Sequence, residues 1–189
     1  MSIYLSLGVI LFCLTHLYPV IFRANRQAII GKIGENPYKG IYSLSILLSL
    51  ALIIFGWRSS DSLYLFDTPE WGRGATSILM YLALFLFMSA KAQNNVKRVI
   101  RHPQLCSILL WGIAHLLSNG ESRSLVLFGI FALWAPVMMF VLNRRDGAWQ
   151  KPNSSPIIND LKTGGIALIV YAVLVFGHSY FTGVSLGTQ

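Results

Sequence analysis

The chain has 189 residues, of which 54% are hydrophobic and only 12% are charged, and its mean hydropathy is +0.60. This composition excludes an ordinary soluble domain and indicates an integral membrane protein. The formal net charge of +8 comes from basic residues in short connections, where contact with anionic lipid explains it. We therefore expect the lipid bilayer as a partner and no nucleic acid.

Six apolar segments follow one another along the chain. Each is close to the ~20 residues that a helix needs to cross ~30 Å of hydrocarbon, and none shows the alternation of a membrane barrel. The sequence predicts an all-α fold, with six transmembrane helices in one bundle and a single domain over residues 1–189. The segments are 3–22, 40–57, 74–90, 104–119, 124–142 and 163–183.

The basic residues predict the orientation of these helices. The connections after the first, third and fifth segments hold twelve of the fifteen Lys and Arg residues, and Arg58, Arg73 and Arg123 lie on the other side. Cytoplasmic loops are enriched in Lys and Arg, so we expect both termini outside. No Lys or Arg precedes the first apolar run, which favours a retained helix over a cleaved secretory signal.

Two of the four histidines, His16 and His115, lie within apolar segments, and His102 and His178 lie near membrane boundaries. A polar side chain at that depth is costly and usually faces a protein interior or a bound group. Trp111, His115 and Asn119 follow one another at spacing four, so one flank of the fourth helix carries an indole, an imidazole and an amide. We expect this flank to face the bundle.

The depths of the two intramembrane histidines suit a shared cofactor. His16 lies ~10 Å inside the boundary marked by Arg23, and His115 lies ~20 Å beyond His102. A haem held between two imidazoles on facing helices is one interpretation, with His16 and His115 as metal ligands and His178 in reserve. The alternative is that each histidine only forms a hydrogen bond with a neighbouring helix.

The fourth segment also carries a motif that resembles a known family. Arg101-His102-Pro103-Gln104, followed by Trp111-x-x-Ala114-His115 and Asn119-Gly120, resembles the signature of the NnrU family of bacterial membrane proteins, whose plant relatives are the 15-cis-zeta-carotene isomerases. The stretch from His16 to Gly40 resembles the opening of that family, and the stretch from His178 to Ser185 resembles its close. The resemblance therefore spans nearly the whole chain.

The resemblance implies a multi-pass protein of the bacterial inner membrane, with b-type haem bound by His16 and His115. In that membrane, the outside termini predicted from the basic residues are periplasmic. It implies a redox, isomerase-like or nitric-oxide and denitrification-linked role, with a hydrophobic or gaseous small ligand and an electron donor as partners. One position departs from the isomerases, which have a cysteine where this chain has Gly112. That departure puts isomerase chemistry in doubt, and the chain need not be an enzyme.

Other classes of function stay open. Arg101-His102-Pro103 is also similar to a motif of isoprenylcysteine carboxyl methyltransferases, which use it in binding S-adenosylmethionine, but the acidic, tyrosine-containing C-terminal segment of those enzymes is missing here. A non-catalytic scaffold or assembly factor for another membrane enzyme would need no cofactor. A zinc site from Cys13, His16, His102 and Cys106 would require large helix tilts.

Overall fold

The computed structural model describes residues 2–184 and 186, and Ser185 of the closing motif lies outside them. The regular structure in this part of the chain is helical, apart from one isolated bridge between Tyr64 and Glu121. A 3-10 turn spans Val96–Arg98, and a π-helical segment, η2, spans Leu125–Gly129. The α-helices are α1 (Ile3–Ile21), α2 (Arg23–Ile33), α3 (Glu35–Arg58), α4 (Gly72–Ser89), α5 (Pro103–Leu116), α6 (Ser122–Ser124), α7 (Ile130–Asp146) and α8 (Ile157–Thr182).

Each of the six predicted apolar segments corresponds to a helix or helical run, and four of them extend one to three residues beyond its end. In the described residues, five helical runs are long and apolar enough to cross a membrane, namely α1, α3, α4, α8 and the continuous run Ser122–Asp146. The fold is therefore that of a multi-pass helical membrane protein. The remaining segment, the fourth along the chain, is α5, whose 14 residues rise only ~21 Å, so helix length alone does not establish a sixth crossing.

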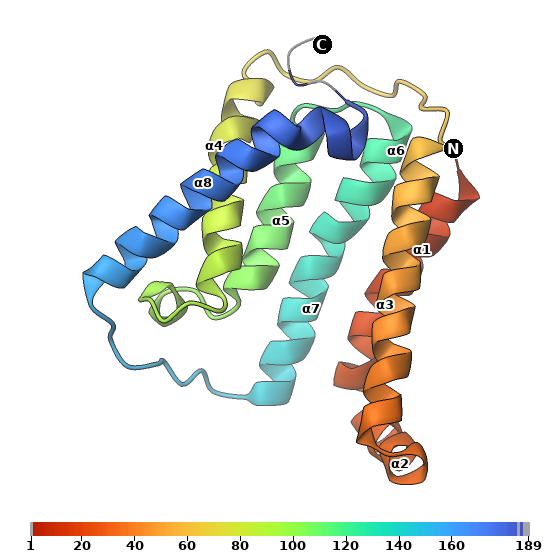
Figure 1. Cartoon of the computed structure of the whole chain (residues 1–189), viewed down its shortest axis with the longest axis vertical. Coiled ribbons are helices and arrows are strands. Elements are labelled where there is room, and N and C mark those ends of the chain that lie inside the picture. The colour runs from red at the N-terminus through yellow and green to blue at the C-terminus, as the bar shows by residue number, and fades with distance from the viewer. Residues whose placement is uncertain (1, 185, 187–189) are drawn as a thin grey trace.

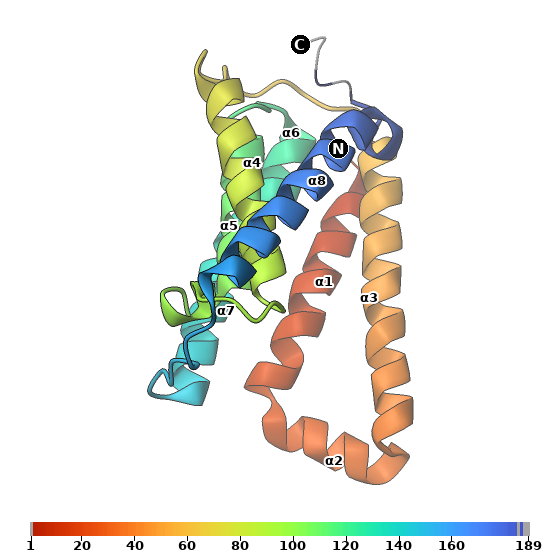
Figure 2. The same cartoon turned by 60° about the vertical axis from the view of Figure 1, so that its left-hand side comes forward.

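The helices form two neighbouring groups (Figures 1 and 2). In the first group α1 lies antiparallel to α3, and in the second α4, α5 and α7 lie side by side while α8 runs obliquely against α4. The α1–α3 contact is close because Gly8 and Gly56 face it. A Cβ on Gly8 would lie 2.8 Å from the Ile53 nitrogen, and one on Gly56 would collide with the backbone of Leu5.

Helix α2 was not expected from the sequence, which suggested only a polar connection there. It lies across the ends of α1 and α3 (Figure 2), and none of its residues is buried. Arg23, Arg26 and Lys32 share it with Ile29 and Ile33. A helix with mixed basic and apolar residues at a membrane boundary typically lies in the interface plane.

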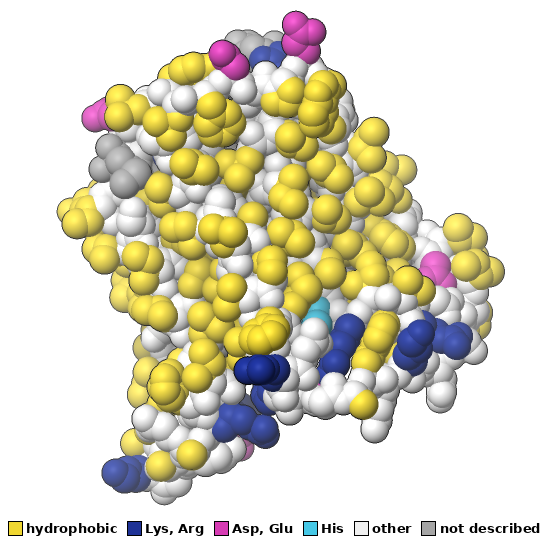
Figure 3. All heavy atoms as spheres, turned by 180° about the vertical axis from the view of Figure 1, so that it is seen from behind, with side chains coloured by type: hydrophobic (Ala, Val, Ile, Leu, Met, Phe, Trp, Pro, Cys, Tyr) yellow, Lys and Arg dark blue, Asp and Glu magenta, His cyan; other side chains and the backbone are white. Residues whose placement is uncertain are grey.

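The basic connections gather at one end of the molecule. Helix α2, the connection between α4 and α5 and the connection between α7 and α8 lie together at this end, here called the basic end (Figure 1). The N-terminus, the C-terminal end of α8 and the connection between α3 and α4 lie at the opposite end, here called the outer end (Figure 1). Between the two ends, apolar side chains cover the face drawn in Figure 3, as contact with lipid requires.

Candidate functional site

His16 is half-buried on α1, where its imidazole is fixed by two contacts with Phe12, one turn earlier. Nδ1 lies 2.8 Å from the Phe12 carbonyl oxygen, and the two rings stack with their centroids 4.1 Å apart. Trp134 of α7 and Tyr42 of α3 approach the imidazole edge-on at 5.8 Å and 6.1 Å. Three helices therefore surround this histidine with aromatic rings.

His115 repeats this arrangement in the last turn of α5. Its Nδ1 lies 2.8 Å from the carbonyl oxygen of Trp111, one turn earlier. Its ring stacks on Phe128 with centroids 4.1 Å apart, and the Trp111 ring lies 5.2 Å away. Phe128 belongs to η2, and single-turn π segments inside α-helices occur frequently at functional sites.

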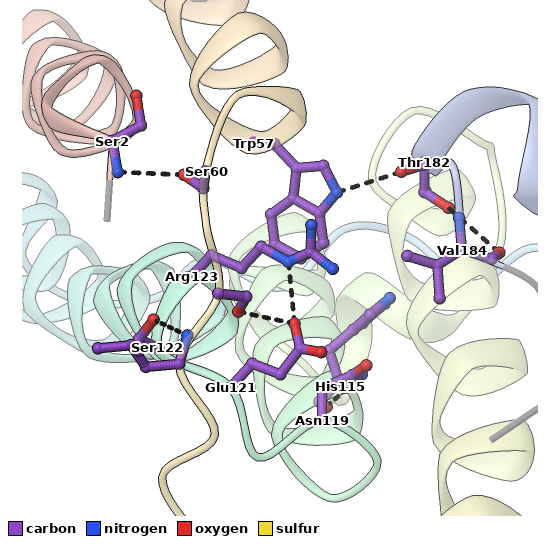
Figure 4. A network of polar contacts seen from close by, with 12 residues as sticks. Ser2, Trp57, Ser60, His115, Asn119, Glu121, Ser122, Arg123, Thr182 and Val184 are labelled. Carbon is purple, nitrogen blue, oxygen red and sulfur yellow. Dashed lines mark hydrogen bonds and ion pairs between the residues drawn. The ribbon is translucent and has the colours of Figure 1, made fainter.

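His178 lies near the end of α8, where the residues that follow it hold its ring. Its Nδ1 is 2.9 Å from the Val184 carbonyl oxygen and 3.2 Å from the Thr182 hydroxyl. The indole of Trp57 on α3 donates to the Thr182 carbonyl at 3.3 Å, as Figure 4 shows. Trp57 also contacts Phe128 edge-on at 5.7 Å, so α3, α8 and η2 meet beside His115.

These three histidines share one tautomer. A carbonyl oxygen only accepts hydrogen bonds, so the Nδ1 atoms of His16, His115 and His178 each carry the proton, and each Nε2 keeps a free lone pair. Histidines that bind metals almost always hold the other ring N–H against such an acceptor. His102 differs, because its Nε2 contacts the Asn143 side-chain oxygen at 2.9 Å.

An aromatic chain separates His16 from His115. Ring contacts run from His16 to Phe12, then to Phe131 at 5.1 Å, then to Trp111 at 5.9 Å and on to His115. His115 stacks on Phe128, and His16 lies beside Trp134. These two aromatic residues belong to one continuous helical run, so at ~1.5 Å per residue the depths of the two histidines differ by roughly 9 Å. The structure thus joins the two histidines through a shared aromatic core, with rings between them.

Trp134 brings an unpaired donor to the His16 side of this core. The residue is only 7% exposed, and its indole Nε1 has no hydrogen-bond partner among the described residues. A buried donor without a partner costs about 1–3 kcal/mol. Nothing in the sequence singled out Trp134. The aromatic pattern that was visible in the sequence is Phe12 four positions before His16 and Trp111 four positions before His115.

The Arg101-His102-Pro103-Gln104 stretch anchors α5 to α7 at the basic end. Arg101 donates to the Gly147 carbonyl at 2.9 Å, and His102 contacts Asn143. Pro103 is the first residue of α5, where a missing N–H is harmless. Gln104 is exposed. These contacts give the motif a structural role.

The Asn119-Gly120 pair ends α5 at the outer end. The Asn119 amide donates to the His115 carbonyl at 2.8 Å (Figure 4), and the Gly120 carbonyl accepts from Leu65 N at 2.8 Å. Thr76 of α4 donates to the Ala114 carbonyl at 2.7 Å. The last carbonyls of α5 are therefore satisfied beside His115, as helix ends require.

A polar cavity of about 280 Å³ adjoins Asn119 at the outer end, lined among others by Tyr64, Asp67, Arg73 and Glu121. The Tyr64 hydroxyl donates to the Asp67 carboxylate, and this hydrogen bond raises the pKa of Tyr64. Glu121 is held by Arg123 at 2.9 Å (Figure 4). The cavity therefore lies just beyond the end of α5, beside the residues that follow His115.

Gly112 lies three residues before His115 and faces η2. A Cβ there would lie 2.6 Å from the Phe128 carbonyl oxygen and 2.9 Å from the Ala132 Cβ. Both distances are shorter than packed side chains adopt, so α5 and α7 touch at this point only because residue 112 is glycine. The plant isomerases have a cysteine at this position. A cysteine would not fit here unless the helices shifted apart.

The zinc interpretation gains no support from the arrangement. Within residues 2–184 and 186, no three His, Cys, Asp or Glu side chains converge on a common point. Cys106 lies 4.0 Å from the Met139 sulfur, and Cys13 is buried as a free thiol.

Comparison with known proteins gives one finding. The family model described as NnrU protein matches residues 4–186, nearly the whole chain. No curated protein and no solved structure matches the chain.

Proposed function

The chain belongs to the NnrU protein family, and from this premise we propose that it binds a b-type haem inside the bacterial inner membrane through His16 and His115. The observation that carries the proposal is the common geometry of these histidines. Each imidazole donates Nδ1–H to the carbonyl four residues earlier, so each Nε2 is available to a metal with its ring already oriented.

The surroundings of His16 and His115 suit a large apolar cofactor. Aromatic side chains from α1, α5, α7 and η2 pack around both residues, and imidazoles are common ligands of haem iron. The unpaired Trp134 indole beside His16 is a donor that a polar group of a ligand would satisfy. The donor set thus fits the group.

A bound haem would supply electron transfer and the binding of small gaseous ligands at its iron. The role that we propose is redox or nitric-oxide-linked. Thiolate ligation of the isomerase kind is not part of it, because Gly112 offers no sulfur and is packed against Phe128 and Ala132.

Two ligand pairs compete within this proposal. His16 with His115 is the pair that the family resemblance implies, and it requires the rings of Phe12 and Phe131 to give way to the cofactor. His115 with His178 is the reserve pair, since Trp57 connects the end of α8 to Phe128, the ring on which His115 stacks. His115 belongs to both pairs, so its loss is the more damaging.

Absorption spectra of the purified protein before and after reduction test the proposal. We expect a Soret band that His115→Ala abolishes and that His16→Ala abolishes or shifts. His178→Ala leaves the band unchanged if His16 is the second ligand, and it shifts the band if the reserve pair is used. His102→Ala is the matched control, because its ring is engaged through Nε2 outside the core.

Carbon monoxide added to the reduced protein separates the two proposed roles. A shifted Soret band means that one ligand dissociates and the iron binds gases, whereas an unchanged band means a fixed electron carrier. A protein that is folded and free of haem after expression with ample haem supply would contradict the proposal and favour the scaffold or assembly function.

A further inference from the structure

A cavity of about 540 Å³ opens at the basic end, between α1, α2, α3 and the last turn of α7. Three cations, each from a different helix, line it together with three hydroxyl groups of α3. They are Arg26, Lys39 and Arg145, with Tyr38, Tyr42 and Ser43. No Asp or Glu is among its lining residues. The polar side chains of the cavity are therefore positively charged donors and hydroxyl groups, all of which can donate hydrogen bonds.

The nearby carboxylates leave this positive charge incompletely neutralised. Lys39 pairs with Glu35 at 2.8 Å, but both side chains are about two-thirds exposed, and such pairs are weak. Arg145 pairs with its neighbour Asp146. Arg26 stacks over Tyr38 at 5.5 Å and forms no ion pair in the described part of the chain. The cavity therefore favours an anion.

The position of the cavity selects an amphiphilic anion. Its remaining wall is formed by Pro19 and Val20 of α1, and Ile21, Ile41 and Leu44 beside it on α1 and α3 are exposed. Helix α2, which lies across the ends of α1 and α3 (Figure 2), contributes Arg26 to the cavity. Cationic donors next to apolar faces match a phosphate with attached acyl chains.

We propose that this cavity binds the headgroup phosphate of an anionic phospholipid, with the acyl chains along the exposed apolar faces of α1 and α3. Basic pockets between helices on the cytoplasmic side are typical sites for such headgroups. Arg26 of α2 and Arg145 of α7 would both donate to the phosphate, and the Tyr42 and Ser43 hydroxyls would donate to its remaining oxygens. This site does not depend on haem.

The test uses the purified, delipidated full chain and compares phosphatidylglycerol with phosphatidylcholine. Binding is measured by native mass spectrometry, and the shift in melting temperature gives a second readout. We expect wild type to prefer phosphatidylglycerol and Arg26→Gln/Arg145→Gln to bind it about tenfold or more weakly. The matched control is Arg23→Gln/Arg144→Gln, which removes the same charge from the same helices outside the cavity and should bind within about twofold of wild type.

Three outcomes would overturn the proposal. Equal loss in both double variants means general attraction between a basic surface and anionic lipid. Equal stabilisation by inorganic phosphate means a site for a free anion. Binding that survives in Arg26→Gln/Arg145→Gln removes the cavity from the interaction. The variant Arg26→Lys/Arg145→Lys controls for misfolding. It keeps both positive charges and should retain most of the preference for phosphatidylglycerol.

Discussion

Gly112 is a residue at which α5 packs tightly against η2 and α7 beside the candidate site. Its missing side chain lets the Phe128 carbonyl approach the α5 backbone, and Phe128 in turn supplies the ring on which His115 stacks. Glycine in a helix interior is unfavourable by about 1 kcal/mol relative to alanine. The close contact therefore outweighs helix propensity at this position.

Gly112→Ala should consequently destabilise the protein in spite of that propensity. The added methyl group would have to displace either the η2 backbone or Ala132, and overpacking of this kind costs about 1–3 kcal/mol. Thermal unfolding in detergent measures the effect. Gly165→Ala on α8, where nothing lies within 4 Å of the new Cβ, is the control and should be neutral or stabilising. Equal melting temperatures for the two variants would contradict the packing argument.

Much of the candidate site could be predicted at the residue scale, but its contacts could not. Side-chain periodicity placed Trp111 and His115 on one flank, and their rings do lie 5.2 Å apart. The sequence carries no information on which ring nitrogen holds the proton, because that depends on the rotamer and on the carbonyl within reach. It also did not show that Phe12 and Phe131 lie between His16 and Trp111, which depends on helix packing.

At the scale of elements, α8 is attached to the rest of the bundle by a polar network at the basic end. Asp160 in the first turns of α8 accepts from the Asn95 backbone N–H at 2.9 Å and from its side-chain amide at 2.6 Å. Asn94, which is 3% exposed, donates to Ser89 and Thr163. Two neighbouring asparagines in the α4–α5 connection thus hold the start of α8.

Asp160→Ala should loosen this end of α8. It removes two hydrogen bonds and leaves the Asn95 N–H without its partner, which costs about 1–3 kcal/mol. A lower melting temperature and faster proteolysis in the connection before α8 are the expected results. Asp146→Ala, whose partner is only the adjacent Arg145, is the control and should change neither. Unchanged proteolysis of Asp160→Ala would show that α8 is held by its apolar packing alone.

The elements themselves were largely predictable because long apolar runs leave few alternatives to helices in lipid. Helix α2 was missed because residues 23–33 mix basic and apolar residues and form no long apolar run. The end of α5 was placed three residues late. Hydrophobicity continues through Leu117, but the helix ends at Leu116, with the Asn119 side chain donating to the His115 carbonyl.

For the whole molecule, the side of the membrane on which the connection between α7 and α8 lies reports whether α5 crosses. With six crossings and an outside N-terminus, the connection between α7 and α8 is cytoplasmic, together with the other basic connections at the basic end (Figure 1). If α5 does not cross, five crossings place that same connection outside. The connection between α3 and α4 is outside in both cases.

We therefore predict opposite labelling of two exposed positions, Asp61 and Asn153. In a chain lacking the native Cys13 and Cys106, a membrane-impermeant maleimide should label Asp61→Cys in intact cells and Asn153→Cys only after permeabilisation. We expect this labelling because Lys and Arg are retained in cytoplasmic loops, which places the connection between α7 and α8 in the cytoplasm. The contacts of α5 with both α4 and α7 are those of a helix that crosses the membrane beside them. Labelling of Asn153→Cys in intact cells would mean five crossings, with α5 held inside the bundle as a short helix that does not span the bilayer.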